Sequence, residues 1–239
     1  KIVVLPFFIM NADVPSLVVP RCALQTTDAL FRVDSLSNVN GSQPSKQAAR
    51  GSICWNETGI TVREYAVDDH IFSPYTRCDQ PVFVDGDVLE VFIAPVLKPT
   101  DSPQWYFELD TSASGVLWAG LSNNSKGNAS TCVSVDGCTA SGPLPCSGWA
   151  HGPRGLTAHA TNHTDMWSTR LFIPWAIFAP EFRPRVNGST SSPWRHWRLN
   201  FYRYDYPGGP GRAYELVAWS PTHDPSFHVP ARFGVAVFK

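Results

Sequence analysis

The chain is poor in methionine and in charged residues, and it carries almost no net charge. Of its 239 residues, 2 are methionine and 16% are charged, and the formal net charge is −1. This balance lacks the basic excess of nucleic-acid-binding domains, so we expect neither a nucleic-acid partner nor an anionic membrane surface as partner. The apolar stretch at residues 1–10 is much shorter than the ~20 residues of a membrane-spanning helix, and no transmembrane segment is expected.

The sequence also lacks the motifs of common catalytic and metal sites. It has no paired C-x-x-C, no H-E-x-x-H, no G-x-S-x-G and no glycine-rich phosphate loop. Glu90, Glu108 and Asp110 are available as a glycosidase pair, but they alternate with apolar neighbours and are therefore expected on outward strand faces. We predict that the protein is not an enzyme.

Proline, glycine and aromatic residues are abundant: 21 Pro, 17 Gly, 9 Trp, 7 Tyr and 14 Phe. This composition, with apolar side chains at every second position of several segments, is typical of short strands joined by turns. We predict an all-β fold, a two-sheet antiparallel β-sandwich with jelly-roll or immunoglobulin-like layers, long disulfide-stapled loops and at most one or two short helices. Residues 34–52 and 122–153 are expected to be loops, and residues 174–178 a short helix.

Cysteines and N-glycosylation sequons indicate an extracellular protein. The six cysteines and six sequons together favour a secreted, disulfide-bonded glycoprotein. Three cysteines lie before residue 80 and three within 132–146, so if all six pair, at least one disulfide joins the two groups. The predicted disulfide residues are Cys22, Cys54, Cys78, Cys132, Cys138 and Cys146, and the predicted glycosylation sites are Asn40, Asn56, Asn123, Asn128, Asn162 and Asn187.

The N-terminal residues 1–15 are treated as an apolar extension or strand, followed by a single domain at 16–239. Residues 1–10 are almost wholly apolar, and such a segment must be covered to avoid aggregation. Two hypotheses stay open: a first strand of the domain's own sheet, or a strand donated to a neighbouring subunit through Ile2, Val4 and Phe7.

Several segments together resemble a known family, the family 9 carbohydrate-binding modules and their relatives of the DOMON type. The segments that carry the resemblance are residues 82–95, 105–110, 166–175 and 194–238. The last of these is the most specific, and the similarity extends over roughly residues 17–238. The resemblance implies a two-sheet sandwich without catalytic machinery, a shallow sugar site clamped by aromatic side chains and, in some members, structural calcium.

Sugars bind proteins by stacking their C–H faces on aromatic rings while polar side chains hold the hydroxyls. We predict Trp219, in a loop after a strand, as the first platform, with Trp118 or Trp55 as the opposing plate. Arg203 and Glu108 are predicted hydroxyl partners. Trp167 and Trp197 fall on inward faces, and we expect them in the core.

Acidic residues in loops are candidate calcium ligands, because calcium prefers several oxygen ligands. The candidates are Asp68, Asp69, Asp85 and Asp87, but they lack the spacing of a defined calcium loop, and the sequence favours turn formation for them. No other cofactor is expected. The sequence thus favours a non-catalytic secreted glycoprotein that binds glycans through loop aromatics. The alternative is a structural subunit of an extracellular filament or matrix that assembles head to tail through its N-terminal strand.

Overall fold

The computed structural model describes residues 14–22, 29–36, 44–78, 80–123, 130–134, 155–178 and 196–239. Strands and two single 3₁₀ turns, η1 (Trp175–Ile177) and η3 (Pro230–Arg232), make up the regular structure of this described part. The strands are β1 (Ser16–Val19), β2 (Ala29–Leu36), β3 (Pro44–Trp55), β4 (Gly59–Val67), β5 (Val88–Val96), β6 (Trp105–Ser112), β7 (Leu117–Asn123), β8 (Ser130–Ser134), β9 (Thr157–Asn162), β10 (Met166–Pro174), β11 (His196–Asp205), β12 (Glu215–Ala218) and β13 (Gly234–Phe238).

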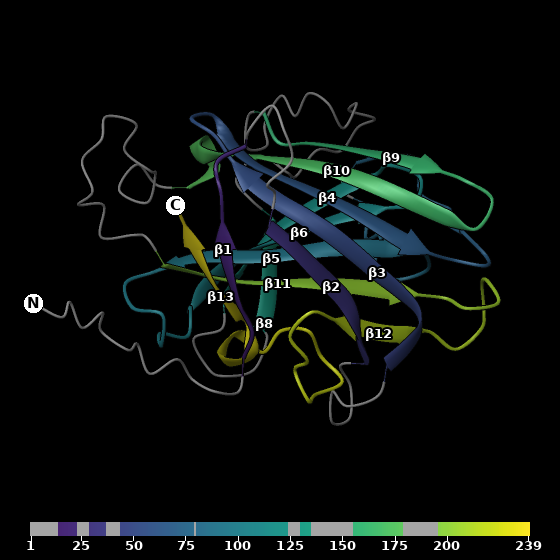
Figure 1. Cartoon of the computed structure of the whole chain (residues 1–239). Coiled ribbons are helices and arrows are strands. Elements are labelled where there is room, and N and C mark those ends of the chain that lie inside the picture. Colours follow the sequence, from purple (N-terminus) through teal and green to yellow (C-terminus); the bar gives the residue numbers. More distant parts are fainter. Residues whose placement is uncertain are drawn as a thin grey trace, which may run out of the picture.

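The strands form two facing layers, so the predicted β-sandwich is confirmed (Figure 1). Sheet I has the order β9-β10-β4-β3-β2 and is antiparallel. Sheet II has the order β8-β7-β6-β5-β11, with β12 and β13 paired to successive parts of β11 on its other edge. Because β1 pairs with β13 in parallel, sheet II is mixed and not purely antiparallel as predicted.

The two layers are joined at one side. Strand β12 of sheet II pairs with the end of β2 through Val217 and Ala218, which lie opposite Leu36 and Ser35. A single parallel bridge between Arg21 and Trp55 connects the segment after β1 to the end of β3. Hydrogen bonding therefore runs continuously from one sheet into the other, while most of the β2 edge remains beside the opening between the layers.

The main core lies between the sheets and is formed by alternate strand positions. Leu89, Val91 and Ile93 of β5 point inward, and their even-numbered neighbours point to the outer face of sheet II. Trp167 is 0% exposed and Trp197 1%, which confirms their prediction as core residues.

The outer face of sheet II is covered as well. A second cluster joins strand residues of this face to Phe227 and Phe233 of the segment after β12. A third joins Tyr75 and Val82, from the segment between β4 and β5, to Val88 at the start of β5. Polar side chains on this face therefore lie under packed loops instead of facing water.

Two segments predicted as loops contain strands. Strand β3 begins at Pro44, inside the predicted loop 34–52, and β8 lies inside the predicted loop 122–153. The first half of β3 has small, polar and charged residues, so it gives no alternating apolar signal. In this half, Pro44 pairs with Ser35 of β2, and Ala49 pairs with β2 on one side and β4 on the other. This tertiary pairing outweighs the weak local β-propensity. The predicted helix at 174–178 is only the 3₁₀ turn η1.

One predicted disulfide is described completely. Cys22 and Cys54 are bonded, which ties the segment after β1 to β3. Cys78 is also disulfide-bonded. Cys22 and Cys54 bond to each other. Of the three cysteines before residue 80, Cys78 is therefore the one that the prediction pairs with a cysteine within 132–146. The side chains of Cys132, Cys138 and Cys146 lie outside the described part, and their pairing stays a prediction.

Candidate functional site

Three acidic side chains lie next to one another on the outer face of sheet II. Glu90 of β5 is directly opposite Asp110 of β6, and Glu108 lies one row away, opposite Phe92. They are 1%, 0% and 4% exposed, respectively. The sequence correctly placed them on an outer face, but the loops that cover this face bury them.

Burial changes the ionisation of two of these acids. It raises the pKa of Glu90 and of Asp110 well above the usual range, and the neighbouring carboxylates raise both further. Glu90 Oε1 and both carboxyl oxygens of Asp110 have no hydrogen-bond partner. Burial without a cationic partner therefore favours the protonated form of this carboxyl pair.

Trp118 of β7 lies on the same face, opposite Asp110. A Cβ atom built on Gly120 would be 2.4 Å from Cη2 of the Trp118 ring, so only glycine leaves room for the indole there. Gly120 is directly opposite Glu108. Trp118 is partly exposed, and Phe83 meets its ring edge to face at a centroid distance of 5.4 Å. The strand register therefore places the indole ring of Trp118 beside the carboxylate of Glu108.

His228, Tyr106 and Ser122 complete this group. The Tyr106 hydroxyl and His228 Nδ1 are 2.7 Å apart, and Ser122 Oγ donates to Glu108 Oε2 at 3.2 Å. His228 Nε2 is 3.8 Å from Glu108 Oε2, too far for a direct hydrogen bond. Burial lowers the pKa of His228, which favours the neutral imidazole. We call Trp118, Glu108, His228, Tyr106 and Ser122 the acidic–aromatic site.

The other predicted sugar-binding residues lie elsewhere. Trp219 is partly buried, and a Cβ on Gly234 would be 2.3 Å from its ring. Trp55 donates from Nε1 to the Lys239 carbonyl, and the Arg21 guanidinium lies over its ring. Arg203 is 0% exposed and points between the sheets. The structure thus brings together Trp118 and Glu108 of the five predicted residues.

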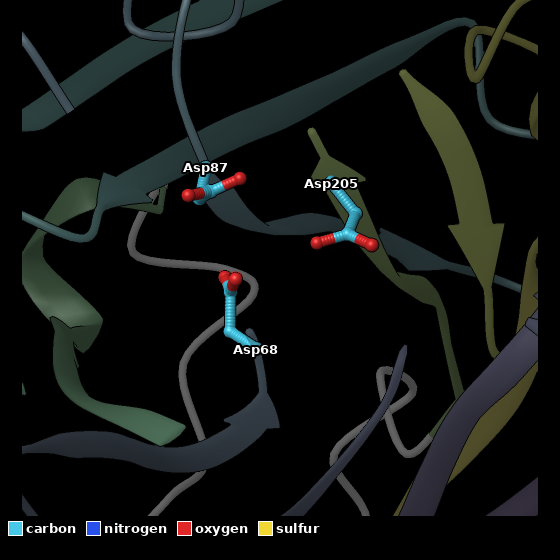
Figure 2. Close-up of side chains that lie close together, drawn as sticks. All are labelled: Asp68, Asp87 and Asp205. Carbon is cyan, nitrogen blue, oxygen red and sulfur yellow. The ribbon is translucent and has the colours of Figure 1, made fainter. Parts of the chain in front are cut away.

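A second acidic cluster lies between the sheets, at one end of the sandwich. Carboxylate oxygens of Asp68, Asp87 and Asp205 are within 4.8 Å of one another, and their side chains point toward a common centre (Figure 2). Asp68 and Asp87 are two of the four predicted calcium ligands. The other two point elsewhere: Asp69 accepts a hydrogen bond from Gln47, and Asp85 is exposed.

Arg203 supplies positive charge to this cluster. Its Nη2 donates to Asp68 Oδ2 at 3.0 Å and to Asp205 Oδ1 at 2.5 Å, and its Nη1 donates to the carbonyls of Gln47 and Val67. The guanidinium therefore joins β11 of sheet II to β3 and β4 of sheet I.

The carboxylate oxygens of this cluster suit a guanidinium better than a calcium ion. Calcium takes six to eight oxygen ligands. Here both oxygens of Asp87 accept backbone N–H groups, both oxygens of Asp68 are bonded, and Asp205 Oδ2 is the one carboxylate oxygen of the cluster without a partner. The calcium site stays a prediction, with Arg203 as the cation that the chain itself provides.

Sequence reasoning missed four residues of these clusters: Tyr106, Ser122, Asp205 and His228. Asp205 and Asp68 are 137 residues apart in the sequence (from 68 to 205), so no local pattern links them. Tyr106 lies in the segment 105–110, which was recognised without a site role. His228 lies nine residues after Trp219, the predicted platform, and this closeness in sequence was the available signal.

The sites of glycosylation and assembly are only partly described. Asn162, at the end of β9, is exposed, whereas Asn56 uses its side-chain oxygen to accept three hydrogen bonds in the β3–β4 turn. Asn123 ends β7, and Asn40, Asn128 and Asn187 lie outside the described residues. Ile2, Val4 and Phe7 lie outside them too, so strand donation stays a prediction. Among the described residues, no helix has the length and apolar character needed to cross a membrane.

Comparisons with known proteins agree on the architecture. No family model matches the chain, and no curated sequence relative was found. A solved structure of a putative carbohydrate-binding protein from Bacteroides uniformis has a TM-score of 0.61 at 14% identity, covering 94% of this chain and 99% of that one.

Two structures of a family 9 carbohydrate-binding module from Caldicellulosiruptor kristjanssonii are also similar. The complex with cellotriose has a TM-score of 0.55 and the complex with glucose 0.54, each at 11% identity and each covering 94% of this chain. They cover 93% and 95% of the respective module chains. At such identities the likeness concerns the fold, and the DOMON label stays a prediction. The chain therefore has the fold found in these carbohydrate-binding structures.

Proposed function

We propose that the protein is a secreted, non-catalytic glycan-binding protein whose sugar site is the acidic–aromatic site on the outer face of sheet II. The observation that carries this proposal is the position of the Trp118 ring, packed against Gly120 and next to Glu108. The fold that the chain shares with carbohydrate-binding structures supports it.

The chemistry of the site suits a sugar ring. A pyranose presents C–H groups on its face and hydroxyls around its edge, and a partly exposed indole offers the apolar surface that such a face needs. The 3.8 Å between His228 Nε2 and Glu108 Oε2 suits a hydroxyl that bonds to both atoms. The neutral imidazole and the carboxylate then hold the ring's orientation.

The same geometry favours binding over hydrolysis. A glycosidase places two carboxyl groups on opposite sides of the scissile bond, where each touches the substrate. Glu90 and Asp110 are buried beneath the loops at 1% and 0% exposure, and neither reaches a glycan on the surface. Glu108 is the one of the three acids that lies beside the partly exposed His228, with its Oε2 3.8 Å from Nε2.

Replacing Trp118 by alanine is expected to weaken glycan binding by about tenfold or more, because the stacking surface is lost. Isothermal titration calorimetry against a panel of soluble oligosaccharides measures the effect. Trp105→Ala is the matched control, since Trp105 is a 46% exposed tryptophan of β6 outside the acidic–aromatic site. An equal loss of glycan affinity in both variants would refute the proposal, and so would the absence of any glycan binding by the wild-type protein.

Glycosylation is expected at Asn162, because its side chain is exposed at the β9–β10 turn. Protein secreted from a eukaryotic host is expected to carry a glycan there, and Asn162→Gln is expected to remove one glycan mass in mass spectrometry. An unmodified Asn162 peptide from such a host would contradict this expectation. Asn56→Gln serves as the comparison at a sequon whose side chain is engaged in a turn.

A further inference from the structure

Tyr214, which directly precedes β12, is an exposed aromatic residue that other rings hold in place. Its side chain is 53% exposed, and the centroid of its ring lies 5.7 Å from that of Tyr204 and 5.7 Å from that of Tyr206. The Tyr206 hydroxyl donates to the Val84 carbonyl at 2.8 Å, which fixes the Tyr206 ring in turn. An exposed ring with two aromatic neighbours presents a stacking face at a small cost in conformational entropy.

A series of contacts connects Tyr214 to the acidic–aromatic site. Phe83 meets the Trp118 ring edge to face, as described above. Val84 follows Phe83, is 53% exposed, and accepts the hydrogen bond from Tyr206, which in turn contacts Tyr214. We call Trp118, Phe83, Val84 and Tyr214, all at least partly exposed, the apolar strip.

The strand order of sheet II shows how far the strip extends. Strands β6 and β5 lie between β7, which carries Trp118, and β11, which carries Tyr204. Three strand spacings separate β7 from β11, which places Trp118 ~14 Å from the strand whose Tyr204 contacts Tyr214. Trp118 and Tyr204 pack against the same cluster around Val88, so both belong to the outer face. A pyranose ring is much smaller than this separation, so a single sugar on Trp118 does not reach Tyr214.

Polar groups lie beside the strip. Asp85 follows Val84 directly and is exposed, and its backbone N–H donates to the Tyr75 hydroxyl at 3.0 Å. Its carboxylate can accept hydrogen bonds from sugar hydroxyls, as Glu108 can beside Trp118. Contiguous exposed apolar side chains mark ligand or partner surfaces. A glycan suits this combination, because its C–H faces stack on apolar side chains while its hydroxyls bond to polar ones.

We propose that the apolar strip extends the acidic–aromatic site into a binding face for a linear, neutral polysaccharide, with sugar rings lying along it from Trp118 to Tyr214. The strip acts only with a sugar on Trp118, and its role therefore rests on the proposed function. The carboxylates of Glu108 and Asp85 disfavour an anionic chain. A single sugar uses only the Trp118 end, whereas a longer chain gains contacts with Val84 and Tyr214, so the site selects its ligand by length.

Isothermal titration calorimetry tests this by comparing the disaccharide and the hexasaccharide of the cello-, xylo-, manno- and chito-oligosaccharide series. In a series that binds, we expect the hexasaccharide to have about tenfold or more higher affinity than the disaccharide. Tyr214→Ala is expected to lose most of this gain and to keep the affinity for the disaccharide, which does not reach residue 214. Tyr214→Phe retains the stacking ring and is expected to bind both lengths like the wild type.

Tyr65→Ala is the matched control, because Tyr65 is a 41% exposed tyrosine of β4 in the other sheet. Two outcomes would overturn the role of the strip and leave the proposed function intact: equal affinities for the two lengths with binding that still depends on Trp118, or a gain with length that Tyr214→Ala retains. The second would show that a longer chain only offers more copies of the same short binding unit. Disaccharide binding that Trp118→Ala leaves unchanged, or no binding in any series, would refute the acidic–aromatic site and the strip with it.

Discussion

Replacing Arg203 by methionine is expected to lower the free energy of unfolding by ~3–5 kcal/mol, the usual effect of removing one partner of a buried ion pair. Arg203 and its partners Asp68 and Asp205 are all 0% exposed. Without the guanidinium, three neighbouring carboxylates stay between the sheets with no cation, and two backbone carbonyls lose their donor. The contact that joins β11 to β3 and β4 is lost at the same time.

Thermal and urea denaturation followed by circular dichroism measure this effect, and a decrease in Tm of ~6–20 °C is expected for a domain of this size. Arg212→Met is the matched control, because Arg212 is exposed in the β11–β12 connection and its loss is expected to change stability by less than ~0.5 kcal/mol. Adding Asp68→Asn and Asp205→Asn to Arg203→Met is expected to restore part of the loss. A decrease no larger than that of Arg212→Met would show that the cluster does not stabilise the fold.

Raising the pH from about 5 to about 8 is expected to destabilise the protein, in part through Glu64. This residue of β4 is 2% exposed and faces the space between the sheets, and burial raises its pKa from 4.5 to about 8. Its folded pKa is above its unfolded pKa, so the native state binds the proton more tightly. The contribution of Glu64 to the free energy of unfolding is therefore greatest at low pH. Up to ~5 kcal/mol of this free energy is lost as the pH rises through about 8.

Urea denaturation across this pH range tests the prediction by comparing the wild type with Glu64→Gln, which mimics the protonated side chain. The free energy of unfolding is expected to decrease less with pH in the variant than in the wild type. The difference between the two curves separates the effect of Glu64 from that of the other acids with raised pKa values. These include Asp87 and Asp205, with pKa values of about 6 and about 7. Glu57→Gln, at an exposed position of the β3–β4 turn, is expected to match the wild type. Parallel curves for the wild type and Glu64→Gln would refute the assignment.

Local patterns in the sequence predicted those parts of the fold that depend on local properties. Strands β4, β5, β10 and β11 were predicted because apolar residues on one side of each strand face the main core. The first half of β3 was missed because its side chains contribute little apolar surface, and pairing at its two ends, Pro44 and Ala49, holds it in the sheet. The sequence predicted Trp118 and Glu108 individually, whereas their proximity depends on the register of β6 against β7.

The sequence by itself determined the β-sandwich class, because period-two alternation of large apolar residues is a local property that only a sheet with a buried face satisfies. Tertiary structure alone decided which polar residues meet. Asp68, Asp87 and Asp205 come from separate segments, and Trp118 and Tyr204, which pack against the same cluster, come from β7 and β11. Strand order and register set these contacts, and both result from packing of the whole chain. For the same reason a chain with almost no net charge has buried acids on the outer face of sheet II.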